Sequence, residues 1–110
     1  MMIVMMASAI SMLGLQASVN APRGAFASCI QEATAKAKTE NVKVEAYGDY
    51  VRSACSPAGA KLKNALVAFD TKNGVAKNRA TADAQMEVDD SLDAAIRTYK
   101  RLNAPDPQVQ

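Results

Sequence analysis

One apolar pattern limits the fold of this chain more than any other feature. From residue 44 to residue 69, apolar side chains recur in steps of three and four residues, which is the spacing of one face of an α-helix. The pattern keeps its phase over 26 residues and comprises Val44, Tyr47, Val51, Cys55, Ala58, Leu62, Leu66 and Phe69. No stretch shows the alternation that is typical of a β-strand, so the pattern predicts an all-α protein.

Pro57 lies inside this pattern and leaves two interpretations open. In the first, one long helix continues through residues 44–73 and is kinked where proline lacks an N–H and crowds the carbonyl four residues back. In the second, Ser56 caps a new helix with Pro57 at its first position. We favour the kinked helix because the apolar phase is unbroken. Gly74 is expected to end this segment as a left-handed C-terminal glycine.

Two further amphipathic stretches flank the central one. The upstream face comprises Phe26, Cys29, Ile30, Ala33 and Ala37, and the downstream helix, from about Lys77 to Leu102, carries Ala84, Val88, Leu92, Ala95, Ile96, Tyr99 and Leu102. With a turn over residues 39–43, the three stretches predict a three-helix antiparallel bundle, or a helical hairpin plus a third helix. Within it, Leu62, Leu66 and Phe69 are expected to pack against Leu92, Ile96 and Tyr99.

The two cysteines lie at equal distances from the predicted turn. Cys29 and Cys55 are each 13 residues from Val42. In an antiparallel hairpin, residues equidistant from the turn lie opposite each other, and both cysteines also lie on the apolar faces of their helices. The positions of the two cysteines along their helices and the faces on which they lie are therefore both compatible with a disulfide. Such a bond needs Cα atoms roughly 4.4–6.8 Å apart. The sequence predicts a Cys29–Cys55 disulfide within the first hairpin.

The first 27 residues have the character of an export signal. Residues 1–15 are apolar, with serines as the only polar side chains, and small-residue cleavage motifs that end at Ala17, Ala21 and Ala27 follow. We expect residues 1–27 to be a signal peptide, with an uncleaved membrane anchor as the alternative. The predicted helical domain is then 28–103, followed by a disordered tail at 104–110. The expected location is periplasmic or secreted.

The composition excludes several classes of function. The chain has no histidine and no tryptophan, and its net charge is only +2. Without histidine it lacks the commonest general base and the commonest neutral metal ligand. We therefore expect neither an enzyme nor a cofactor or metal site. A charge so near balance also argues against nucleic acid as a partner. Asp83, Glu87 and Asp90 share one helical face, and we interpret that face as a solvated acidic surface.

Three segments resemble a group of small exported proteins of Gram-negative bacteria. They are CIQEATAKAK (29–38), YVRSAC (50–55) and LVAFDTKNGV (66–75). The resemblance implies export and an address in the bacterial envelope, and it implies no activity.

Two functions from different classes are compatible with these features. The first is a structural or interaction module of the periplasm that binds another protein through a helical face. The second is a carrier or stress chaperone that holds an apolar ligand between its helices. An apolar cavity of roughly 300 Å³ or more would favour the carrier, whereas an exposed apolar patch would favour partner binding. Contact with a membrane is expected only through the leader, if it is not removed.

Overall fold

The structure, a computed structural model, describes the backbone of residues 2–103 and the side chains of residues 18–103. Within this range every regular element is a helix, as the sequence predicts. The helices are α1 (Met2–Thr39), α2 (Val44–Ala54), α3 (Ser56–Lys72) and α4 (Lys77–Asn103). The predicted signal peptide lies partly, and the predicted tail at 104–110 lies wholly, outside the residues whose side chains are described.

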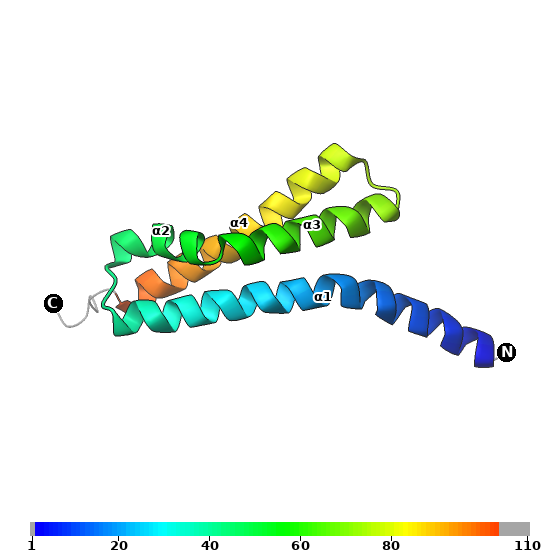
Figure 1. The fold of residues 1–110 in the computed structure, drawn as a ribbon, viewed down its shortest axis with the longest axis horizontal. Helices are drawn as coiled ribbons and strands as arrows, with labels where there is room; N and C mark the ends of the chain where they lie inside the picture. Colours follow the sequence, from blue (N-terminus) through cyan, green and yellow to red (C-terminus); the bar gives the residue numbers. More distant parts are fainter. Residues whose placement is uncertain (1, 104–110) are drawn as a thin grey trace.

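The helices form three rows (Figure 1). α2 and α3 lie end to end and make the middle row, which runs antiparallel to both α1 and α4. Both α1 and α4 pack mainly against this middle row and only sparsely against each other. Toward its N-terminal end, α1 bends away from the other helices (Figure 1).

The predicted continuous helix through Pro57 is wrong, and the bundle has four described helices rather than three. α2 ends at Ala54, and α3 begins at Ser56 with Pro57 in its first turn. A proline at this position removes no hydrogen bond, because the first N–H groups of a helix have no acceptor within the helix. Only Cys55 between them is not helical, and its N–H still bonds to the carbonyl of Val51 at 3.0 Å. This single-residue break explains why the apolar phase continues.

Both turns end their preceding helix with a residue in the left-handed region. Asn41 has a φ of 57° after α1, and Gly74 has a φ of 93° after α3, as expected for a C-terminal glycine. In each turn a backbone N–H reaches back to the helix: that of Val42 to the carbonyl of Ala37 at 2.8 Å, and that of Val75 to the carbonyl of Asp70 at 2.9 Å.

The core follows the three predicted apolar faces. Its buried residues are Val19, Phe26, Ala33 and Ala37 from α1, Tyr47, Val51, Cys55, Leu62 and Leu66 from the middle row, and Ala80, Ala84, Val88, Leu92 and Tyr99 from α4. Leu102, which the sequence pattern assigns to the packed face of the last helix, is instead 60% exposed. Packing also reaches back to Val19, earlier than the predicted domain start at residue 28. Removal of the leader remains a prediction.

The expected register between the middle row and α4 is also wrong. Leu66 and Phe69 line the same hollow as Ala84 near the turn between α3 and α4. Ile96 and Tyr99 lie against α2 instead: the side chain of Ile96 approaches Gly48, and the ring of Tyr99 stacks on Tyr47. The reason is length, because α3 alone reaches only the first part of α4.

Candidate functional site: the disulfide and the groove between α1 and α4

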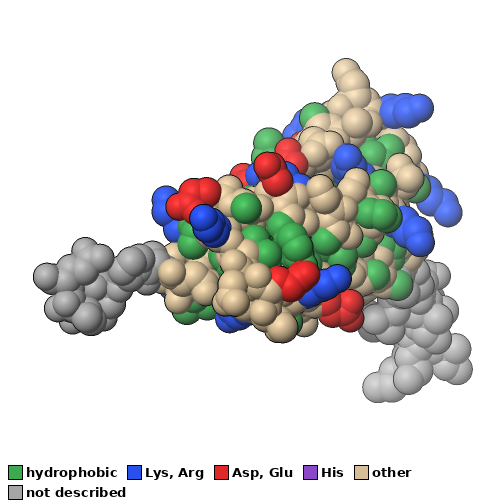
Figure 2. Space-filling model, turned by 60° about the vertical axis from the view of Figure 1, so that its left-hand side comes forward, with side chains coloured by type: hydrophobic (Ala, Val, Ile, Leu, Met, Phe, Trp, Pro, Cys, Tyr) green, Lys and Arg blue, Asp and Glu red, His purple; other side chains and the backbone are tan. Residues whose placement is uncertain are grey.

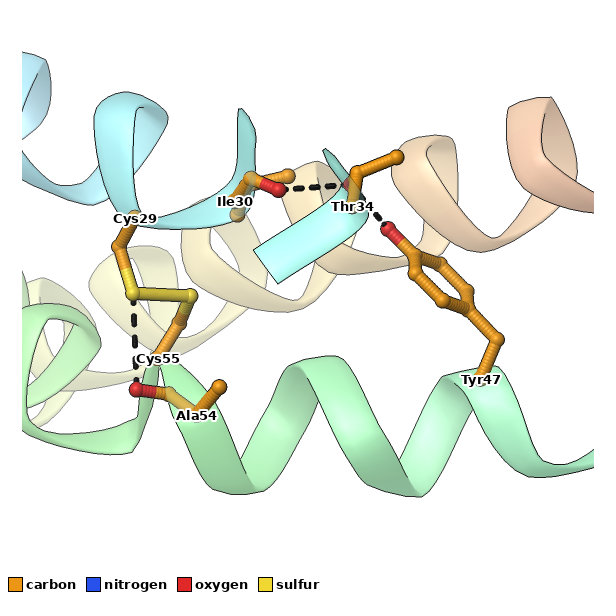
Figure 3. The surroundings of a disulfide bond; sticks show 6 residues. All are labelled: Cys29, Ile30, Thr34, Tyr47, Ala54 and Cys55. Carbon is orange, nitrogen blue, oxygen red and sulfur yellow. Dashed lines mark hydrogen bonds between the residues drawn. A yellow bond between two sulfur atoms is a disulfide. The ribbon is translucent and has the colours of Figure 1, made fainter. Parts of the chain in front are cut away.

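The predicted disulfide is present and joins α1 to the break in the middle row (Figure 3). The Cα atoms of Cys29 and Cys55 are 5.7 Å apart, which is within the range that a disulfide requires. Cys55 is buried at 1% exposure, whereas Cys29 is partly exposed beside it. The Sγ atom of Cys29 also lies 3.5 Å from the carbonyl oxygen of Ala54. Once oxidised, this sulfur has no proton to donate, so the contact is one of packing.

A polar network holds α1, α2 and α4 together next to the disulfide. The hydroxyl of Thr34 donates to the carbonyl of Ile30 at 2.6 Å and lies 2.6 Å from the hydroxyl of Tyr47 (Figure 3). Because Thr34 has one proton to give, we infer that Tyr47 is the donor between the two hydroxyls. The Tyr47 ring stacks on Tyr99 with centroids 4.0 Å apart, and the Tyr99 hydroxyl donates to the carbonyl of Val42 at 2.5 Å. Buried hydroxyls are thereby satisfied, and the C-terminal part of α4 is tied to the first turn.

The sparse contact between α1 and α4 leaves a groove at the surface. We call it the α1–α4 groove; it has a volume of about 460 Å³ and is lined by Ile30, Gln31, Thr34, Ala35 and Lys38 from α1 and by Ala94, Ala95, Thr98, Tyr99 and Leu102 from α4. A second hollow of about 470 Å³ shares Ile30 and Gln31 with it and continues toward Phe26. Several lining residues, Ala35, Ala94 and Thr98 among them, are exposed to solvent. The groove is therefore open and not an enclosed cavity.

Figure 2 shows hydrophobic side chains gathered on one face of the molecule, with acidic and basic side chains beside them. Sequence reasoning missed the α1–α4 groove, because periodicity assigns Ile30, Ala95 and Tyr99 to apolar faces without showing that a groove stays open between those faces.

A third hollow lies where α1, α3 and α4 meet near residue 20. It has a volume of about 300 Å³ and combines Val19, Leu66 and Phe69 with charged side chains. Arg23 donates to Glu87 Oε1 at 2.8 Å across it, while Glu87 Oε2 is buried without a hydrogen-bond partner among the described residues. Both side chains are otherwise partly exposed, at 48% and 38%, so the pair stabilises the fold by only about 0–1 kcal/mol.

The acidic residues that share one helical face, Asp83, Glu87 and Asp90, do not form a metal-binding cluster. Glu87 is paired with Arg23, while Asp83 lies near Arg79, with 3.9 Å between the charged atoms. Among the described side chains, no three of the Cys, Asp and Glu residues come together as metal ligands would. Within the same part of the chain, no helix has the length and apolar character that crossing a membrane demands.

In comparisons with known proteins, no protein-family model, no curated protein and no solved structure matches the chain.

Proposed function

We propose that this chain is an exported, non-enzymatic helical protein that binds a partner protein through the α1–α4 groove. The observation that carries the proposal is the groove itself, in which two parallel helices are held apart by the middle row and expose small and apolar side chains between them. An amphipathic helix of a partner can lay its apolar face into such a groove. The stretch from Ile30 to Lys38 would match about two helical turns of the occupant.

The disulfide supports the export part of the proposal. Disulfides persist in the periplasm and outside the cell and are rare in the cytosol, where thiols are kept reduced. The absence of histidine from the whole chain supports the non-enzymatic part. The resemblance of three segments to small exported proteins points the same way, toward a periplasmic or secreted location.

Binding of an apolar ligand is the second candidate. Its support is the volume of the grooves, because about 460 Å³ lies within the usual range for small-molecule sites. Exposure of the lining residues favours a protein partner over a ligand, since ligand sites bury most of the ligand surface.

Photo-crosslinking from within the groove tests the proposal. A photoreactive amino acid at Ala35 or Thr98, both exposed in the groove, is expected to give a discrete protein adduct in the periplasm. The matched control is Asn64, which is exposed on α3 and lines none of the grooves described above. Ala95→Glu should abolish the adduct from Thr98 by placing a charge in the groove. Equal labelling from all three positions, or none from any, would refute partner binding here. A co-purifying apolar molecule in native mass spectrometry, without a protein adduct, would favour the carrier.

A further inference from the structure

The stretch before the predicted domain start belongs to the core of the bundle. Val19 is 5% exposed and Phe26 is 2% exposed, as low as the central residues of the other helices. The ring of Phe26 lies against α3 at Gly59: a Cβ atom added to Gly59 would be 3.3 Å from this ring and 3.4 Å from Val88 of α4. Gly59 is thus small because Phe26 occupies the space above it.

An ion pair of Arg23 and the position of Pro22 also connect this stretch to the fold. Arg23 pairs with Glu87 of α4 at 2.8 Å. Pro22 lies inside α1, which extends from Met2 to Thr39. A proline in a helix interior removes a backbone hydrogen bond, whereas one in the first turn costs nothing of this kind. A helix that begins at about residue 19 would place Pro22 in its first turn.

We infer that the leader is removed by hydrolysis of the Ala17–Ser18 peptide bond, which makes Ser18 the first residue of the mature protein. This inference rests on the proposed export. A signal peptidase would use one water molecule to release a carboxylate at Ala17 and an amine at Ser18. The motif Leu15-Gln16-Ala17 directly follows the apolar segment, as a cleavage site should. Side chains up to Ala17 lie outside the described residues, and the packing observations all come from residues after it.

The two other motifs conflict with the packing. Cleavage after Ala27 would remove both Val19 and Phe26 from the core and would break the pair between Arg23 and Glu87. Cleavage after Ala21 would remove Val19 and would also require hydrolysis directly before a proline. Cleavage after Ala17 keeps every buried residue of the described part of α1.

The test is to express the full chain in a Gram-negative host and to measure the intact mass and N-terminal sequence of the periplasmic protein. The expected sequence begins Ser-Val-Asn, and the mass is that of residues 18–110. A periplasmic protein that begins at Pro22 or Ser28 would overturn the site and leave export standing. A full-length chain that stays in the cytoplasm would overturn export, and the inference with it.

Matched substitutions test the site independently of the mass. Ala17→Gln should cause the precursor to accumulate, because a small side chain is needed immediately before the cleaved bond. Ala27→Gln is the control; Ala27 is exposed, so the variant should fold and should be processed at the wild-type rate. Accumulation with Ala27→Gln alone, or normal processing of both variants, would overturn the inference.

Discussion

Reduction of the Cys29–Cys55 bond should destabilise the protein by an amount that follows from its position. The bond closes a loop with a sequence separation of 26. In the chain-entropy treatment, a loop of this length corresponds to about 3.5 kcal/mol at 25 °C, because the cross-link restricts the unfolded chain. In a domain of this size, about 1 kcal/mol moves the melting midpoint by about 4–8 °C. We therefore expect the midpoint to fall by about 14–28 °C on reduction.

The assay is thermal unfolding followed by circular dichroism, with and without reductant, and with thiol titration to show that the bond has opened. A Cys29→Ala/Cys55→Ala variant is the control, and its midpoint should not respond to reductant. Because Cys55 is buried, this variant also loses packing, so the comparison within the wild-type protein isolates the bond. An unchanged midpoint in fully reduced wild-type protein would refute the reasoning.

Three further predictions concern single side chains. Phe26→Ala should lower the free energy of unfolding by about 3–5 kcal/mol in urea denaturation, since the ring is buried; a loss below about 1 kcal/mol would contradict its place in the core. Tyr99→Phe keeps the ring but leaves the carbonyl of Val42 without its donor, at a cost of about 1–3 kcal/mol by the same measurement, and no change would show that the bond is replaced by water. The pKa of Tyr50 is raised, first by desolvation and second by Glu40. In the Glu40→Gln variant, NMR titration should therefore show a pKa of Tyr50 that is lower than in the wild type but still above the ordinary value. An unchanged pKa of Tyr50 would exclude Glu40 as a cause. Because the folded-state pKa is the higher one, the contribution of Tyr50 to stability is complete below about pH 10 and is lost as the pH rises through the folded-state pKa.

The disulfide could be predicted because both of its determinants are local. Cys29 and Cys55 lie on apolar faces that any helical periodicity reveals, and the turn between them is short enough for its centre to be located. The same principle applies to the second turn, where Leu66 and Ala84 lie at equal distances from Val75 and line one hollow. Applied there, it would have excluded the expected contact of Phe69 with Ile96.

The break at Cys55 and the α1–α4 groove could not be obtained in this way. A single non-helical residue does not disturb the apolar phase, so periodicity alone cannot separate a kinked helix from two helices that share a face. The groove depends on the spacing between α1 and α4, which are far apart in the sequence and are positioned only through the middle row. Ala35 and Ala95 have the same pattern whether a neighbouring helix covers them or solvent does.

The location of the cross-link at the break in the middle row restricts how the molecule can move. α2 and α3 are two helices joined through Cys55, and that residue is covalently attached to α1. Any bending between α2 and α3 must therefore pivot about Cys55, which the bond attaches to Cys29 of α1. A displacement of α1 along its axis by one turn, about 5.4 Å, would require the bond to break. The bond thereby preserves the register between α1 and the middle row at the level of Cys29 and Cys55.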